Sequence, residues 1–278
     1  MHRLVELSFE DAQPKSRNIG CGYWWKRMTL DFFDCNCQIG RAGVPVAGGP
    51  VTADEIVAAL KPMGIRRALV YSALAKELHP CEGNPAVLEE VKGSGLVPCW
   101  VGLPTSTGEL GTPAEFVASM KASGVGALRL FPALHSYCLA DWCIGPLFEQ
   151  LEESRVPVFV EAAQTNFDHI ASALRAFPEL RLILVRPAYR SDRFIYPLME
   201  KYEQLCVETS NYASSGGIEG VCRRFGSSRL IFGTAMPFYA PGAAVSPITY
   251  AEIDDSDKQA IAGGNLDRLL EWVGEGRA

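Results

Sequence analysis

The chain has 278 residues, of which 48% are hydrophobic and 21% are charged, the composition of an ordinary globular protein with a large core. Its net charge of −6 argues against nucleic acid as a partner. No apolar run approaches the roughly 20 residues that span a bilayer, and the first residues lack a secretory signal, so we expect no membrane association. Nine cysteines, an odd number, favour reduced thiols and a cytoplasmic location.

The first 28 residues precede any regular pattern and end in an aromatic patch, Tyr23-Trp24-Trp25. We expect residues 1–28 to form an N-terminal extension that packs on the domain that follows. The same aromatic patch also suits an interface in a homodimer.

From residue 29 onward, short apolar runs rich in β-branched residues alternate with segments of helical period. Residues 156–160, Val-Pro-Val-Phe-Val, are apolar on both faces, as a buried parallel strand requires. The eight expected strands are 29–35, 67–71, 96–102, 127–131, 156–161, 180–185, 205–209 and 229–232.

Helix starts between these strands support the same alternation. Thr52 with Glu55, and Thr112 with Glu115, have the capping-box spacing in which each side chain satisfies a free backbone N–H. Strands and helices joined by short links imply right-handed crossovers and a parallel sheet. Eight repeats over residues 29–278 predict one α/β domain, a (β/α)8 TIM barrel, which typically takes about 250 residues. An open doubly wound sheet is the alternative.

Five segments follow one another in an order that belongs to a known family. Residues 34–40 read Asp-Cys-Asn-Cys-Gln-Ile-Gly, and the other four segments are 157–161, 177–186, 229–237 and 261–270. Together they resemble the amidohydrolase-related (amidohydrolase 2) family of the amidohydrolase superfamily. That family opens with Asp-x-His-x-His-x-Gly and has Arg-x-Leu-Phe-Gly-Ser-Asp-x-Pro at its last strand. The resemblance implies a metal-dependent-hydrolase fold with its chemistry at the carboxyl ends of the strands.

The positions that hold or serve the family's divalent metal are replaced in this chain. The resemblance matches them to Asn36 and Gln38 after the first strand, Glu161 after the fifth, Arg186 after the sixth and Ala235 after the eighth. Carboxamides are weak ligands, a guanidinium cannot ligate, and alanine offers no donor atom. We therefore predict no metal and no cofactor, and the hydrolytic mechanism loses its metal-activated water.

A thiolate metal site is the alternative at the first strand, because Cys35 and Cys37 form a Cys-x-Cys motif. Strand alternation places these thiols on the face opposite Asn36 and Gln38, toward the helices. A slip of one residue in strand register would exchange the two pairs.

Charged residues from three adjacent strands are expected to meet at the mouth of the barrel. Arg129 on the fourth strand joins Glu161 and Arg186, and buried charges of this kind must pair with one another or with a ligand. Two guanidiniums and one carboxylate suit a carboxylate or phosphate, which arginine binds through two parallel hydrogen bonds. The predicted substrate-binding residues are Asn36, Gln38, Arg129, Arg186, Tyr189, Asn211 and Met236.

Two functions follow from these residues. The first is a non-catalytic barrel, a pseudoenzyme that binds a small anionic metabolite or serves as a scaffold. In a scaffold, the charged residues would form an internal salt-bridge network. The alternative is a metal-independent hydrolase or lactonase, isomerase or decarboxylase of a small carboxylated substrate. Glu161 would then be the catalytic acid or base, and Arg129 and Arg186 would orient the substrate and stabilise negative charge.

Overall fold

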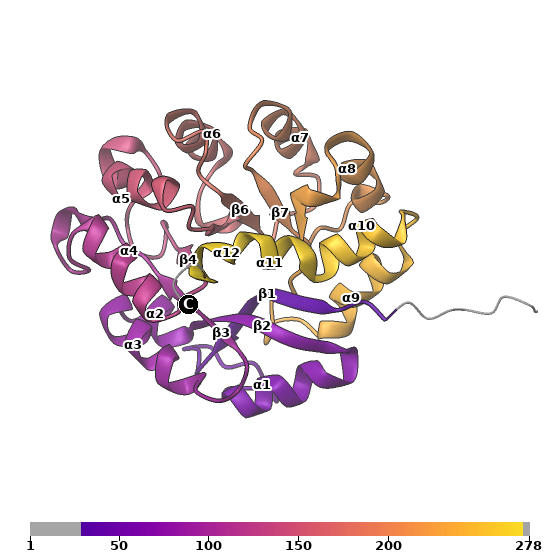
Figure 1. The fold of residues 1–278 in the computed structure, drawn as a ribbon, viewed down its shortest axis with the longest axis horizontal. Helices are drawn as coiled ribbons and strands as arrows, with labels where there is room; N and C mark the ends of the chain where they lie inside the picture. The colour runs from indigo at the N-terminus through magenta and orange to yellow at the C-terminus, as the bar shows by residue number, and fades with distance from the viewer. Residues whose placement is uncertain (1–28, 275–278) are drawn as a thin grey trace, which may run out of the picture.

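The computed structural model describes residues 29–274, and the expected N-terminal extension with Tyr23-Trp24-Trp25 lies outside them. Eight parallel strands follow one another around a nearly closed barrel in chain order, which confirms the predicted TIM barrel (Figure 1). The strands are β1 (Phe32–Ile39), β2 (Ile65–Ser72), β3 (Val97–Val101), β4 (Ala127–Leu130), β5 (Val158–Glu161), β6 (Leu182–Val185), β7 (Cys206–Glu208) and β8 (Leu230–Ile231).

Helices surround the strands, and the last ones cross one end of the barrel (Figure 1). Thr52 and Thr112 cap their helices through the expected capping boxes. None of the helices in the described part of the chain is long and apolar enough to cross a membrane. The helices are α1 (Ala53–Leu60), α2 (Ala73–Glu77), α3 (Pro80–Glu90), α4 (Pro113–Ala122), α5 (Asp141–Glu153), α6 (Phe167–Ala176), α7 (Asp192–Lys201), α8 (Gly217–Phe225), α9 (Pro241–Tyr250), α10 (Asp255–Gln259), α11 (Asn265–Leu269) and α12 (Glu271–Gly274).

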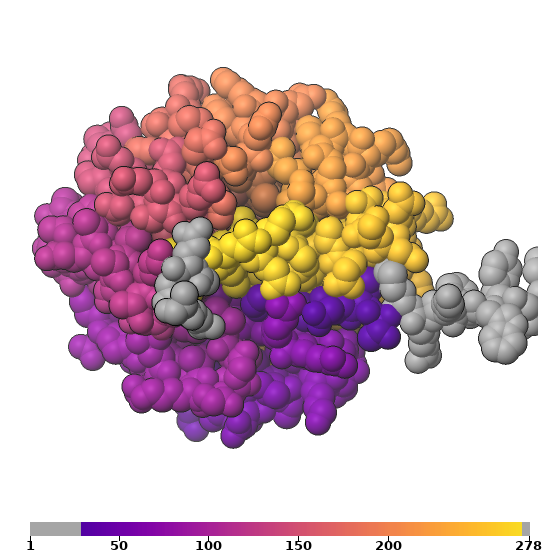
Figure 2. Space-filling view, in the orientation of Figure 1, coloured from indigo at the N-terminus to yellow at the C-terminus, as the bar shows by residue number. Residues whose placement is uncertain are grey.

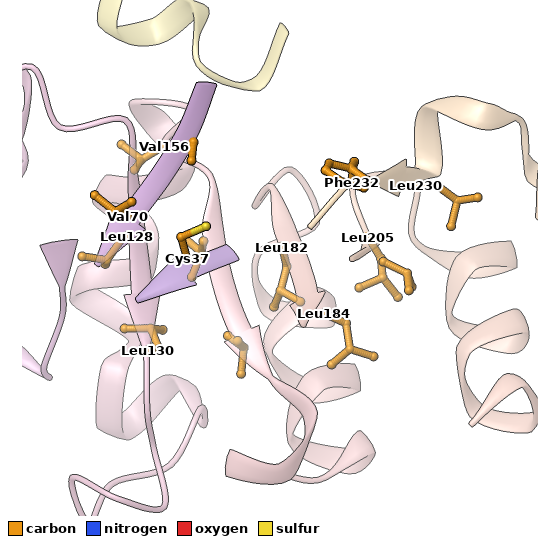
Figure 3. Packing of buried hydrophobic residues seen from close by; sticks show 14 of the residues in the cluster. Cys37, Val70, Leu128, Leu130, Val156, Leu182, Leu184, Leu205, Leu230 and Phe232 are labelled. Atoms are coloured by element: carbon orange, nitrogen blue, oxygen red, sulfur yellow. The ribbon is translucent and has the colours of Figure 1, made fainter. Parts of the chain in front are cut away.

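The hydrophobic core has an outer and an inner layer. The outer cluster lies between strands and helices and includes Leu128 and Leu130 of β4 (Figure 3). Arg129 stands between these two leucines, and side chains alternate along a strand, so it faces the barrel interior. The inner cluster consists almost entirely of strand residues, and Leu266 of α11 packs against it.

The C-terminal helices close the end of the barrel where the strands begin. Trp272 donates a hydrogen bond from Nε1 to the carbonyl of Gly126, which directly precedes β4, at 2.8 Å. In the space-filling view these helices form the band of yellow atoms across the middle of the molecule (Figure 2). Because this end is covered, a ligand must enter from the carboxyl ends of the strands.

A β-bulge in β1 changes which of its side chains face inward. Two residues, Cys35 and Asn36, oppose the single residue Leu69 of β2. Cys35 belongs to the inner cluster, whereas Cys37 belongs to the outer cluster. The expectation that both thiols face the helices is therefore wrong for Cys35, because simple alternation does not hold across a bulge. The bulge places the two thiols on opposite faces of the sheet, which is incompatible with a shared metal ion.

The seam between β8 and β1 is joined partly through side chains. Asp34 is fully buried, and its Oδ1 accepts hydrogen bonds from the backbone N–H groups of Asn36 and Thr234, both at 2.9 Å. Its Oδ2 accepts from the Thr234 hydroxyl and, at 3.0 Å, from the Cys37 thiol. Burial raises the pKa of Asp34, and the four donors oppose this rise. The seam thus depends on a buried carboxylate saturated with donors.

Candidate functional site

Polar side chains fill the interior of the barrel at the carboxyl ends of its strands, where TIM-barrel proteins carry their functional residues. Some come from the strands and one from the short helix α2. We call this set the mouth cluster, and its members are Asn36, Gln38, Lys76, Arg129, Glu161, Arg186 and Glu208.

Arg129 is the most deeply buried cation of the mouth cluster, with 1% of the residue exposed. Its Nη1 donates to Asn36 Oδ1 at 2.8 Å, and its Nη2 lies 3.7 Å from Glu161 Oε2. The guanidinium also lies 4.3 Å from the ring centroid of Tyr71, within the range of a cation–π interaction. Burial raises the pKa of Tyr71 to about 12, so this ring stays neutral beside the arginine.

Glu161 joins the two arginines, and the backbone of the second is held in place by another carboxylate. Arg186 Nη1 lies 2.9 Å from Glu161 Oε1. The Arg186 backbone has φ +50°, and its N–H donates to Glu208 Oε2 at 3.0 Å. Ser210 gives Glu208 two more hydrogen bonds, at 2.7 and 2.9 Å, which oppose the rise in the Glu208 pKa caused by burial. A side chain on Gly233 would overlap Glu208, so this glycine leaves room for the carboxylate.

Lys76 is a member of the cluster that sequence reasoning missed, because it stands in a short Ala-Leu-Ala-Lys-Glu segment without a distinctive pattern. Its Nζ lies 3.5 Å from Gln38 Oε1, and 5.6 and 5.2 Å from the ring centroids of Phe131 and Phe238. Burial lowers the pKa of Lys76, the charge of Glu161 opposes this, and the two nearby arginines add to it.

Within residues 29–274, four buried nitrogen atoms of the mouth cluster have no hydrogen-bond partner. They are Asn36 Nδ2, Gln38 Nε2, Arg129 Nε and Arg186 Nε. All four are N–H donors, and a buried donor without an acceptor costs about 1–3 kcal/mol. The cluster therefore has more buried donors than acceptors.

A divalent metal does not fit these residues. Among residues 29–274, no group of three or more histidine, cysteine, aspartate or glutamate side chains is placed to hold a metal ion. Glu161 and Glu208 are already engaged by guanidinium, backbone and hydroxyl donors. The unpaired atoms at the mouth are N–H groups, which cannot ligate, and three side-chain cations surround the position.

The structure brings together Asn36, Gln38, Arg129, Glu161 and Arg186 as the sequence led us to expect. It places the other three predicted residues differently. Tyr189 is 67% exposed and its ring lies 5.1 Å from the Arg190 guanidinium. Asn211 is half-buried in the loop after β7. The Met236 side chain packs in the outer cluster, while its backbone carbonyl accepts from the N–H of Gln38 at 2.8 Å.

The loop after β8 contributes aromatic rings to the mouth instead. Phe238 lies beside Lys76, and the hydroxyl of Tyr239 accepts from Arg186 Nη2 at 3.3 Å. The Arg186 guanidinium also lies 5.3 Å from the Tyr239 ring centroid. These rings give the cluster apolar walls on one side.

A cavity of about 470 Å³ lies beside the mouth, between the segments that follow β2, β3 and β4. His135 lines this cavity, and its ring packs edge-on against Phe131 with 6.0 Å between ring centroids. His135 Nε2 also donates to the backbone carbonyl of Lys76 at 2.7 Å. Burial lowers the pKa of His135, in keeping with a neutral ring.

The chain belongs to the Amidohydrolase family, whose model matches residues 84–272, more than half of the sequence. An uncharacterised TIM-barrel protein from Bordetella bronchiseptica is 17% identical with a TM-score of 0.67, over 88% of this chain and 100% of that one. The 5-carboxyvanillate decarboxylase of Sphingomonas paucimobilis is 13% identical with a TM-score of 0.66, over 87% and 99% of the two chains. A 2,6-dihydroxybenzoate decarboxylase from Rhizobium is 14% identical with a TM-score of 0.68, over the same shares. No curated protein matches the sequence.

Proposed function

We propose that the mouth cluster binds a small carboxylate anion and that it does so without the divalent metal of the family. The observation that carries this proposal is the set of four buried nitrogen atoms, on Asn36, Gln38, Arg129 and Arg186, for which the described part of the chain supplies no acceptor. Each oxygen of a carboxylate accepts two hydrogen bonds, so one carboxylate has as many acceptor positions as the cluster has unpaired nitrogen atoms.

The charge balance of the cluster supports the same ligand. Lys76, Arg129 and Arg186 carry positive charge, and Glu161 and Glu208 carry negative charge when ionised. This leaves one net positive charge in a buried site, and one carboxylate neutralises it. Because the site is shielded from water, the attraction is stronger than between the same charges on a surface.

The surroundings favour a ligand with an apolar body. The aromatic rings of Phe131, Phe238 and Tyr71 line the cluster. Two of the similar structures are named as decarboxylases of 5-carboxyvanillate and 2,6-dihydroxybenzoate, which are aromatic acids. Aromatic monocarboxylates are therefore the first ligands to test.

Binding without turnover is the simpler form of this function. Both carboxylate oxygens of Glu161 are already paired with guanidiniums, so neither is left to act on a ligand. A metal-independent reaction, such as lactone hydrolysis, isomerisation or decarboxylation, is the second candidate. The half-buried amine of Lys76 is the observation that favours it.

Titration calorimetry with acetate, benzoate, 2,6-dihydroxybenzoate and phosphate tests the binding. We expect saturable binding of at least one carboxylate. Arg186→Met should weaken it by about 10- to 100-fold, because a hydrogen bond to a charged group contributes about 1.5–3 kcal/mol. Arg190→Met is the matched control, since Arg190 packs on exposed Tyr189. Equal affinity in the wild type and Arg186→Met, or no binding at all, refutes the proposal.

A further inference from the structure

We propose that Lys76 is a catalytic amine that forms an imine with the carbonyl of a small 2-keto acid whose carboxylate is held by the mouth cluster. This inference rests on the proposed function, since it requires the carboxylate site. In a 2-keto acid the carbonyl carbon is bonded directly to the carboxylate carbon, so the two groups enter a compact site together.

The surroundings of the Lys76 amine are those of an activated lysine. Its Nζ lies over the rings of Phe131 and Phe238, at 5.6 and 5.2 Å from their centroids. The two oxygens of Glu161 form ion pairs with the two arginines, and Nζ donates to the uncharged amide of Gln38 at the long distance of 3.5 Å. A lysine desolvated by apolar groups and placed near other cations keeps more of the neutral, nucleophilic form.

The backbone that carries Lys76 is fixed on two sides. His135 donates from Nε2 to the Lys76 carbonyl at 2.7 Å. On the other side α3 packs so closely on α2 that a side chain on Gly83 would overlap the backbone of Ala75, the residue before Lys76. The base of the side chain therefore stays in place, and only its methylene chain has to move for the amine to reach a ligand.

The reaction balances without a metal or an oxidant. The neutral Nζ attacks the carbonyl carbon, the carbonyl oxygen takes up protons and leaves as water, and a protonated C=N bond remains. This bond withdraws electrons, so the carbon next to it releases a proton to solvent and an enamine forms. Return of a proton and of water regenerates the keto acid and the free amine. The observable result is exchange of hydrogen at the carbon next to the carbonyl.

Borohydride trapping with pyruvate tests the proposal on the full-length protein. Reduction of the imine fixes one pyruvate to the chain, and peptide mass spectrometry should place the adduct on Lys76. Lys76→Arg keeps a positive charge at the site but cannot form the adduct, so it should lose the trapping and the exchange of the pyruvate methyl hydrogens seen by NMR in deuterated water. Lys92→Met, which removes an exposed lysine paired with Glu89, should retain both.

A parallel calorimetric titration with pyruvate separates this proposal from the one on which it rests. Binding without an adduct or hydrogen exchange overturns the imine and leaves the carboxylate site intact. Neither binding nor adduct refutes both proposals. An adduct that persists in Lys76→Arg also overturns the assignment, because another amine would then be responsible.

Discussion

Replacement of Glu161 by glutamine tests whether the mouth cluster is an ion-paired network open to an anion. The Glu161 carboxylate lies 2.9 Å from Arg186 Nη1 and 3.7 Å from Arg129 Nη2, and 11% of its side chain is exposed. At an effective dielectric constant of about 20, each pair is attracted by about 4–6 kcal/mol. Part of this is offset by the several kcal/mol that it costs to bury the carboxylate. Since the glutamine oxygen still accepts from Arg186, we expect Glu161→Gln to lower the free energy of unfolding by about 3 kcal/mol.

The same substitution should make the protein more responsive to carboxylates. It raises the net charge of the cluster by one, so benzoate should bind about 10-fold more tightly and restore about 1.4 kcal/mol more stability than in the wild type. Urea denaturation with and without benzoate measures both effects, and Glu149→Gln, at an exposed position of α5, is the control. Unchanged stability in Glu161→Gln, or equal stabilisation of both proteins by benzoate, would refute the reasoning.

Further predictions concern the pH dependence of stability, the close approach of Gly263 to Asp31, the seam between β8 and β1, and the metal. Burial lowers the pKa of Lys76 from its ordinary 10.5, so the unfolded chain binds the lysine proton more tightly than the folded protein does. The free energy of unfolding should therefore increase as the pH rises toward 10.5. In urea denaturation across this pH range, the free energy of unfolding should rise less in Lys76→Met than in the wild type. An equal rise in the two proteins would contradict this prediction. A Cβ on Gly263 would lie 2.5 Å from the Asp31 carbonyl, whereas one on Gly264 meets its nearest atom at 3.6 Å. Gly263→Ala should therefore cost about 1–3 kcal/mol or more, and Gly264→Ala should be neutral or slightly stabilising; equal melting temperatures would count against this packing. Thr234→Val removes a donor from buried Asp34 and should cost about 1–3 kcal/mol in urea denaturation, while Thr249→Val at the surface should cost far less; similar losses would exclude a special role for the seam. Dialysis against a chelator should leave the melting temperature unchanged, and one equivalent of zinc or manganese bound at the mouth would overturn the conclusion about the metal.

Much of the fold follows from local pattern, because buried parallel strands and capped helices leave strong signals in the sequence. The capping boxes at Thr52 and Thr112 are local and appear as expected. β1 departs most from the expectation, since it runs from Phe32 to Ile39 and contains a bulge that depends on pairing with β2 and β8. No pattern within the strand announces that bulge.

The residues of the candidate site also differ in how well the sequence predicts them. Arg129, Glu161 and Arg186 were predicted because they stand at the ends of apolar strands. Lys76 enters the cluster from a short helix whose position depends on its packing against α3, which the sequence does not reveal. Tyr189 was expected at the mouth from its loop alone, but a loop residue has no strand register to fix its direction, and its ring turns outward.

The three cations at the mouth also bear on any attempt to engineer the family's chemistry into this barrel. A histidine at position 36 would lie beside Arg129, and one at position 38 would lie beside Lys76, because these cations contact the amides that stand there now. A single substitution of this kind would not create a metal site, because the positive charges already present would repel the metal ion. Engineering a metal site into this barrel therefore begins with the removal of Lys76 and the arginines, which also removes the ion pairs at the mouth. Only then can newly introduced ligands bind a metal ion.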